Sequence, residues 1–320
     1  MWQGLYEIFG TGENYMTFDD NTKKYITSII GHFNILNDHR KDSARTGVVE
    51  ILSEEKWLFL KIHSRLSHWN PEVYAYNNWT KHLGDYAPSL VTSFNNDEVY
   101  GIVMTPIQGR TVNEMEINND DKLAYIYYNA GHLFKKMQST TTGNYFGIPK
   151  ADGSPYNESA ETNPVQYMIN SIESIVKNAY DKKIIDVSYE PLIKWSLDNC
   201  FIFADEVPVP TNWDLSQNNW MVNEIGEFIG FIDFENMRWG LSLDSFAVIK
   251  ERYTFDKPFL LDSFYSGYGL VHSDVEKIKQ TILGVNSSIA SIVYGYLYGN
   301  KRFYDCGARM LQSLLSNYEG

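Results

Sequence analysis

The chain has 320 residues, of which 43% are hydrophobic and 15% aromatic, and its formal net charge is −13. This composition can bury a large core in one or two domains, and it contains no run of about 18 apolar residues that would predict a membrane span. The acidic balance argues against a nucleic-acid-binding protein, whose surface would have to be basic.

Two further absences narrow the class of protein. The first residues lack a basic segment followed by an apolar stretch, so we expect no secretory signal and a cytoplasmic location. Cys200 and Cys306 are isolated and predict free thiols. The histidines form no ligand pair with a carboxylate cluster along the sequence, and we expect no zinc site.

The first third of the chain predicts an antiparallel sheet with two helices. Helical periodicity covers residues 19–30, and strands are expected at residues 33–37, 48–52, 58–63, 90–94 and 99–107. Between the third and fourth of these strands, Asn70-Pro71 predicts the start of a helix over residues 71–83. Asn70 would be its cap and Pro71 would lie in its first turn.

Lys61 and Glu72 are the polar residues of interest in this region. Lys61 ends an apolar strand, and Glu72 is the only acidic residue between Lys61 and Asp85. A strand lysine paired with a glutamate on the following helix is the arrangement that grips the α- and β-phosphates in kinases. Taken singly, Lys61 could be an edge lysine with its ammonium in water, and Glu72 a first-turn acid favoured by the helix dipole.

After Gly109 the pattern becomes helical. Helices are expected at residues 120–138, 163–180 and 189–203, and again at 243–251, 257–268, 273–297 and 302–315. Residues 140–164 are rich in Gly, Ser, Asn and Pro and predict a long loop. Its length is consistent with a substrate loop or lid, and equally with a passive insertion.

Asp214-Leu-Ser-Gln-Asn-Asn219 is the most informative segment, and Asp233-Phe234 follows it nineteen residues after Asp214. The segment resembles the Asp-Leu-x-x-x-Asn of a kinase catalytic loop, and Asp-Phe resembles the metal-binding segment that follows such a loop. Phosphoryl transfer needs an aspartate at the acceptor hydroxyl, together with an Asn and an Asp that hold Mg²⁺ on the nucleotide phosphates.

The residues between Asn219 and Asp233 predict a β-hairpin. Strands at residues 220–222 and 227–232 flank a turn at residues 223–226, which contains Gly226. Such a hairpin would bring Asn219 and Asp233 side by side. On these residues alone, a surface hairpin with ordinary Asn and Asp turn residues is an equal alternative.

Five further segments join these motifs into a resemblance to the aminoglycoside phosphotransferase family, the antibiotic-kinase branch of the protein-kinase-like fold. Each resembles a known part of that family: the loop and strand over the nucleotide, the lysine strand, the interlobe hinge, a C-lobe helix, and the segment after the metal-binding aspartate. In this chain they are residues 44–50, 59–61, 103–109, 130–137 and 244–247.

The resemblance implies an α+β, bilobal fold, with a nucleotide-binding N-lobe over residues 1–107 and a mainly helical C-lobe over residues 108–320. It implies a Mg²⁺-dependent kinase that uses ATP or GTP to phosphorylate a hydroxyl of an aminoglycoside-like small molecule. The negative net charge would suit a cationic acceptor.

The resemblance also implies a role for each site residue. Asp214 would be the catalytic base, Asn219 and Asp233 the Mg²⁺ ligands, and Lys61, held by Glu72, the phosphate-binding group. Four further positions would contact the nucleotide: Ser43 over the phosphates, Met104 at the entrance to the pocket, and the Thr105 carbonyl and Ile107 N–H at the adenine edge.

The chain departs from the family pattern at three points. Asn212-Trp213 precedes Asp214 where the family has His-Gly, Glu235 follows Asp233-Phe234 where kinases have Gly, and no Gly-x-Gly-x-x-Gly phosphate loop is present. Asn212 and Trp213 favour a pseudokinase-like binding module as one alternative. A kinase of a natural-product or peptide biosynthetic pathway is another.

Overall fold

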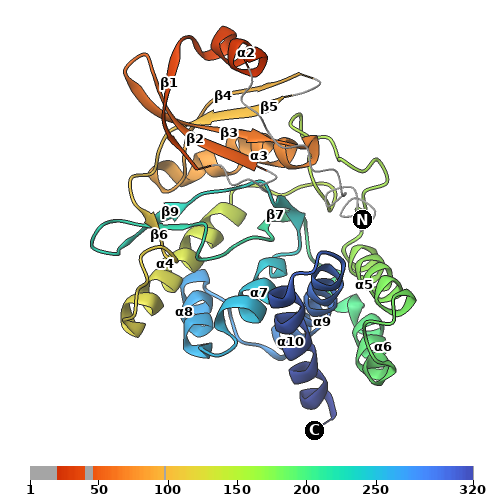
Figure 1. The fold of residues 1–320 in the computed structure, drawn as a ribbon. Coiled ribbons are helices and arrows are strands. Elements are labelled where there is room, and N and C mark those ends of the chain that lie inside the picture. Colours follow the sequence, from red (N-terminus) through yellow and green to blue (C-terminus); the bar gives the residue numbers. More distant parts are fainter. Residues whose placement is uncertain (1–19, 40–45, 97–98, 320) are drawn as a thin grey trace.

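The computed structural model describes residues 20–39, 46–96 and 99–319 (Figure 1). An antiparallel sheet forms the N-lobe, with strand order β1-β2-β3-β5-β4. Its strands are β1 (Phe33–Asp38), β2 (Thr46–Ser53), β3 (Lys56–His63), β4 (Leu90–Asn95) and β5 (Tyr100–Met104). All five expected strands are present, but β5 ends at Met104 rather than at residue 107.

The alternation of side chains along β3 separates two environments. Leu58, Leu60 and Ile62 point to one face and pack with α2 (Asp20–Ile30) through Ile26. The intervening Lys61 and His63 point to the opposite face, because successive strand residues alternate. Both are buried there. The strand therefore places a lysine and a histidine on the face of the sheet that looks toward the C-lobe.

The helix after β3 begins earlier than the sequence predicts. α3 spans Leu66–Asn78, and a 3₁₀ helix follows at Thr80–Tyr86. Pro71 lies inside α3 rather than in its first turn. Asn70 is not its cap, and its Oδ1 instead accepts a hydrogen bond from the N–H of Ala151, at 3.1 Å. Nine residues of α3 are buried, so tertiary packing outweighs the loss of one helical hydrogen bond at proline.

Helices form most of the C-lobe, as Figure 1 shows. They are α4 (Asp120–Gln138), α5 (Pro164–Asp181), α6 (Glu190–Asp198), α7 (Asp244–Ile249), α8 (Pro258–Tyr268), α9 (Asp274–Leu297) and α10 (Lys301–Glu319). Three shorter turns accompany them: 3₁₀ helices at Val187–Tyr189 and Cys200–Phe203, and a π-helical turn at Lys250–Thr254. The expected fold class, a sheet-based N-lobe on a mainly helical C-lobe, is confirmed.

Two small sheets lie between the lobes and carry the site. One has the strand order β6-β8-β9, and the other pairs β10 with β7. Their strands are β6 (Arg110–Thr111), β7 (Val209–Asn212), β8 (Trp220–Val222), β9 (Phe228–Phe231) and β10 (Met237–Gly240). The β8–β9 hairpin is as expected. Strands β6, β7 and β10 were not predicted, because they are only two to four residues long and show no detectable alternation.

The long loop before α5 is packed against its surroundings. Gly147 forms an isolated bridge with Trp239 of β10, and Tyr145 and Phe146 are buried. The contact between Ala151 and Asn70 attaches the same loop to α3. These contacts make the loop part of the connection between the lobes. Among the described residues, no helix is both long and apolar enough to cross a membrane.

Candidate active site

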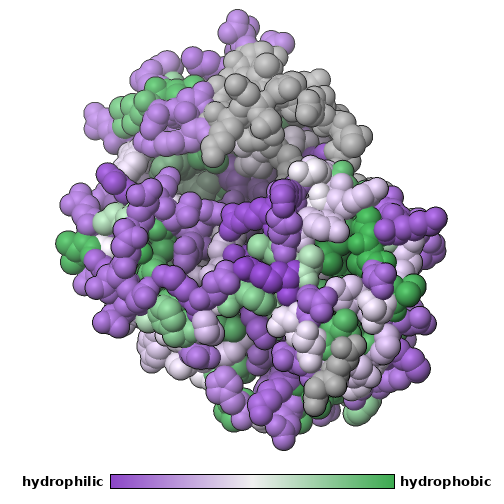
Figure 2. Space-filling view, turned by 60° about the horizontal axis from the view of Figure 1, so that its bottom comes forward, coloured by the Kyte–Doolittle hydropathy of each residue, from purple (hydrophilic) through white to green (hydrophobic). Residues whose placement is uncertain are grey.

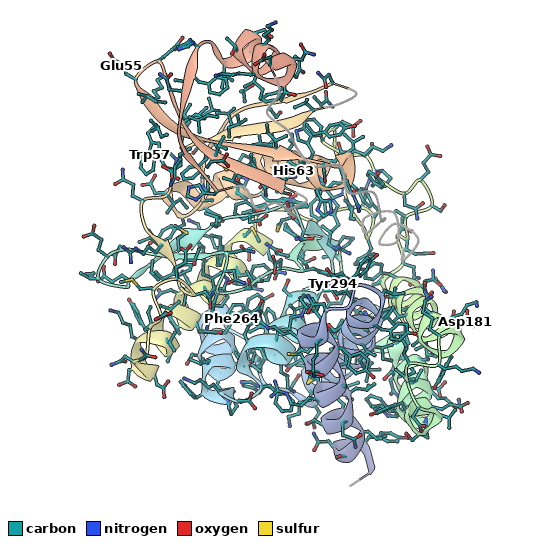
Figure 3. All side chains as sticks on the ribbon, in the orientation of Figure 1. Glu55, Trp57, His63, Asp181, Phe264 and Tyr294 are labelled. Carbon is teal, nitrogen blue, oxygen red and sulfur yellow. The ribbon has the colours of Figure 1, made fainter. Side chains whose placement is uncertain are left out.

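A buried cluster of charges surrounds the ammonium group of Lys61. Its Nζ lies 2.7 Å from Oε2 of Glu72, 2.9 Å from Oδ1 of Asp233 and 3.2 Å from Oε2 of Glu235. One lysine therefore contacts three carboxylates, two of them from the segment after β9. The contact with Asp233 joins the N-lobe sheet to the C-lobe. Figure 3 labels His63, which ends the central strand β3 of the N-lobe sheet.

The residues that α3 contributes to the charge cluster lie on one face of the helix. His68, Glu72 and Tyr76 follow one another at four-residue intervals, which places them on the same side of the helix. The side chain of Glu72 is fully buried against Lys61. The hydroxyl of Tyr76 donates to Sδ of Met104 at 3.1 Å, and its ring packs edge-on against Phe234.

Asp233 owes its position to the β8–β9 hairpin. Trp220 pairs with Phe231, and the N–H of Ile232 donates to the carbonyl of Asn219 at 2.9 Å. The structure thus places Asn219 and Asp233 at adjacent ends of the hairpin. Asp233 itself has φ = 64°, a left-handed conformation that Asp tolerates better than most residues.

Asp214 and Asn219 are joined directly within the loop between β7 and β8. Nδ2 of Asn219 donates to Oδ2 of Asp214 at 3.0 Å and to its backbone oxygen at 2.9 Å. The N–H of Asp214 donates to Oδ1 of Asn212 at 2.8 Å, so Asn212 supports the loop by accepting a hydrogen bond. The negative charge of Asp214 also contributes to the raised pKa of Asp233.

Glu235 is a component of the cluster that the sequence analysis noted only as a departure from Gly. Its Oε2 accepts from the hydroxyl of Thr46 at 3.0 Å, and its Oε1 lies 3.6 Å from Nδ1 of His68. Nε2 of His63 lies 2.9 Å from Oε2 of Glu72. The expectation that histidines pair with no carboxylate cluster was therefore wrong. The pairing joins residues far apart in the chain, and sequence spacing carries no signal for it.

His63, Glu72 and Glu235 present ligand atoms close enough together to hold a metal ion. Lys61 already lies against both carboxylates. We therefore interpret these three residues as the surroundings of an ammonium group.

The electrostatics of the cluster follow from burial and shared charge. Burial alone would lower the pKa of Lys61, but its three carboxylates hold it well above the usual value. Burial raises the pKa of Asp233 to about 7; Lys61 opposes this shift, and the neighbouring carboxylates add to it. Burial would also raise the pKa of Glu235, but Lys61 and His68 hold it well below its usual range. The cluster carries more negative than positive charge.

This donor set fits a magnesium ion. Asn219 uses its amide nitrogen toward Asp214, which leaves its Oδ1 as the atom able to bind a cation. Asp233 is a crowded carboxylate whose charge a cation would compensate. Oxygen ligands of this kind suit Mg²⁺.

The structure places the expected hinge directly after β5. Met104 is buried, and the N–H of Thr105 donates to the carbonyl of Ser89 at 3.0 Å. A Cβ at Gly109 would overlap the carbonyl of Val222, so only glycine permits this approach to β8. The adenine contacts assigned to Met104, Thr105 and Ile107 remain predictions. Ser43 lies outside the described residues.

A pocket of about 180 Å³ lies on the C-lobe side of Asp214. Trp213 and Asp214 line it from the loop between β7 and β8, and Tyr294 lines it from α9. Figure 3 shows Tyr294 at the end of α9 nearest the N-lobe, on the C-lobe side of the boundary between the lobes. The sequence analysis did not identify this pocket, because its residues come from five separate segments.

Comparisons with known proteins agree with this geometry. No family model matches the chain, and no curated protein matches it in sequence. Solved structures do match. A thermostable mutant of aminoglycoside phosphotransferase APH(4)-Ia, in ternary complex with ADP and hygromycin B, has a TM-score of 0.70 at 12% identity over 94% of this chain and 99% of that chain.

Two further structures match over nearly their whole length. The gentamicin–APH(2")-IIa complex has a TM-score of 0.60 at 17% identity and covers 93% of this chain and 97% of that chain. The GDP complex of wild-type aminoglycoside 2'-phosphotransferase-IIIa has a TM-score of 0.64 at 12% identity, and the match covers 94% of this chain and 100% of that chain. The chain has the fold of the aminoglycoside phosphotransferases.

Proposed function

We propose that this protein is a Mg²⁺-dependent kinase that transfers the γ-phosphoryl group of ATP or GTP to a hydroxyl of a small molecule. The observation that carries the proposal is the convergence of Lys61 and Glu72 from the N-lobe with Asp214, Asn219 and Asp233 from the C-lobe. The fold and the nucleotide complexes of its structural neighbours support it.

Each side chain has a defined task in this proposal. Lys61, oriented by Glu72, binds nucleotide phosphates, and Asn219 and Asp233 hold Mg²⁺, which neutralises phosphate charge. Asp214 accepts the proton of the acceptor hydroxyl. The acceptor oxygen then bonds to the γ-phosphorus, and the bond from that phosphorus to the nucleoside diphosphate breaks, so that the diphosphate leaves with the electron pair.

The proposal is tested by replacing the two aspartates separately. Asp214→Asn should lower turnover by about 10²–10⁴-fold and leave nucleotide affinity unchanged. Asp233→Asn should abolish the Mg²⁺-dependent part of nucleotide binding, because it removes a charged ligand. Nucleotide consumption over a panel of hydroxyl acceptors measures the first effect, and calorimetric titration with Mg-ATP and Mg-GTP measures the second.

Asp262→Asn is the matched control, because Asp262 is exposed on α8. It should behave as the wild type in both assays. Unchanged turnover in Asp214→Asn would refute its role as the base. Unaltered metal-dependent binding in Asp233→Asn would place the metal ligands elsewhere.

A nucleotide-binding module without transfer activity is the second candidate. The observation that favours it is Trp213, whose bulky ring lines the same pocket as Asp214 and restricts the room for an acceptor hydroxyl. The titrations separate the candidates, because such a module would bind Mg-nucleotide and consume none with any acceptor.

A further inference from the structure

The pocket beside Asp214 is built from one face of α9 and the segments around β10. Leu283, Ser287, Ala290 and Tyr294 recur at helical spacing and line one wall. On the face drawn in Figure 2, hydrophilic side chains gather across the middle of the molecule. At about 180 Å³ the pocket exceeds the roughly 150 Å³ of an engineered cavity that binds benzene. It therefore has room for a small ring.

Arg238 lines this pocket with a charge that no carboxylate contacts. The residue is 5% exposed, and its guanidinium carbon lies 3.8 Å from the centre of the Trp213 ring. Its Nε has no hydrogen-bond partner, and within the described parts of the chain no carboxylate lies within 4.0 Å of it. A buried charge without a counter-ion is costly, so this guanidinium is suited to receive an anion.

The second arginine of the pocket is already paired. Nε of Arg252 lies 3.6 Å from Oε1 of Glu251, and its terminal nitrogen donates to Oγ of Ser291 at 3.3 Å. Its guanidinium also lies over the ring of Phe303. Nε of neither arginine forms a hydrogen bond, but Arg252 has a carboxylate within 4.0 Å and Arg238 does not.

Two carboxylates line the pocket, and neither forms an ion pair with Arg238, although the charge of Asp244 raises the pKa of the guanidinium against the effect of burial. Asp244 accepts from the N–H of Leu241 at 3.0 Å, and burial raises its pKa to about 7, so it is only partly ionised near neutral pH. Asp214 accepts a hydrogen bond from Nδ2 of Asn219 at 3.0 Å. The pocket therefore differs from the acidic surface that the net charge of −13 would suggest.

We propose that the acceptor of this kinase carries an oxyanion, a carboxylate or a phosphate, that binds Arg238 while its hydroxyl lies at Asp214. This inference rests on the proposed function for the hydroxyl and replaces the expectation of a cationic acceptor. Trp213 stands where the family has Gly. In this proposal its ring orients the guanidinium group of Arg238. Planar, forked donors suit both carboxylate and phosphate oxygens.

A series of four small aryl alcohols tests the ligand class without nucleotide. The probes are 4-(hydroxymethyl)benzoate, 4-(hydroxymethyl)phenyl phosphate, 1,4-benzenedimethanol and 4-(aminomethyl)benzyl alcohol, with affinities measured by ligand-observed NMR and calorimetry. The carboxylate or the phosphate should bind about 10–100-fold more tightly than the neutral diol, and the amine should bind most weakly. The anion that binds more tightly identifies whether the acceptor carries a carboxylate or a phosphate.

Variants locate the effect at Arg238. Arg238→Gln should reduce the affinity of the anions to that of the diol, whereas Arg238→Lys should retain part of the preference. Arg309→Gln is the control, since Arg309 is exposed on α10, and should keep the full preference. If Arg238→Gln does not fold, Arg238→Lys provides the test. An anion affinity of Arg238→Lys equal to that of the wild type would then refute the proposal.

Three results would overturn the inference: no binding by either anion, tighter binding of the amine, or an anion preference that survives in Arg238→Gln. Transfer from Mg-ATP to the anionic alcohols is measured separately. Anion binding without transfer would count against the kinase proposal alone. Transfer to neutral or cationic alcohols in preference to the anions would count against the anionic acceptor alone.

Discussion

Replacement of Lys61 by methionine tests whether the charge cluster stabilises the fold. Lys61→Met keeps the length of the side chain but leaves Glu72, Asp233 and Glu235 without their shared cation, which lies 2.7–3.2 Å from each. Loss of one partner from a buried ion pair costs about 3–5 kcal/mol. Since unfolding entropy is about 2.1 cal/mol/K per residue, the melting temperature of this 320-residue chain should fall by about 4–8 °C.

The loss should depend on pH in a defined direction. Without Lys61 the folded-state pKa values of the three carboxylates rise above their unfolded values, so the folded form binds more protons. Stability is then retained at low pH and lost as pH rises through those folded pKa values. Thermal unfolding at pH 5 and pH 8 should therefore show the larger deficit at pH 8.

Lys56→Met is the matched control, because Lys56 is exposed on the same strand and should change stability by no more than about 0.5 kcal/mol. The double variant Lys61→Met/Glu235→Gln should recover part of the loss, since it removes one uncompensated charge. If Lys61→Met melts within 1 °C of Lys56→Met at pH 8, the cluster is not a net stabilising feature, and the reasoning fails.

Three further predictions concern the C-lobe. Asp244→Asn should gain stability relative to the wild type as pH rises, because the raised pKa of Asp244 makes the wild type lose stability between about pH 4 and 7. Urea unfolding at several pH values measures the free energy of unfolding of both proteins; a difference between them that does not change with pH would contradict the prediction. Gly267→Ala should lower the melting temperature by several degrees, because its methyl group would overlap the carbonyl of Tyr128; an unchanged melting curve would contradict the packing of α8 on α4. Asn212→Ala should lower turnover by about tenfold with unchanged nucleotide affinity, because the loop loses the hydrogen bond that holds Asp214; equal steady-state rates would argue against that role.

Local rules were sufficient to predict much of the site. The position of Lys61 on the inner face follows from strand alternation alone, and the hairpin that joins Asn219 to Asp233 follows from two apolar strands around a glycine turn. The start of α3 could not be predicted, because burial against both lobes overrides the local preference of Pro71 for a first turn.

Contacts between distant segments had no signal in the sequence. Glu235 acquires its role from Thr46, Lys61 and His68, all on the other lobe. Arg238 lies on a four-residue strand that the periodicity did not predict, and its pocket is completed by α9. Both depend on tertiary arrangement, which single-sequence patterns do not encode.

The packing of α3 has a practical consequence for attempts to divide the protein. By sequence α3 precedes the hinge, yet Trp69, Val73 and Trp79 belong to the same apolar core as the C-lobe helices, while the β3 residues Leu58 and Leu60 belong to a separate one. A chain cut after residue 107 would expose these tryptophans in one fragment and their apolar contact residues in the other. Either fragment expressed alone should therefore aggregate, and complementation of the two fragments would require their co-expression.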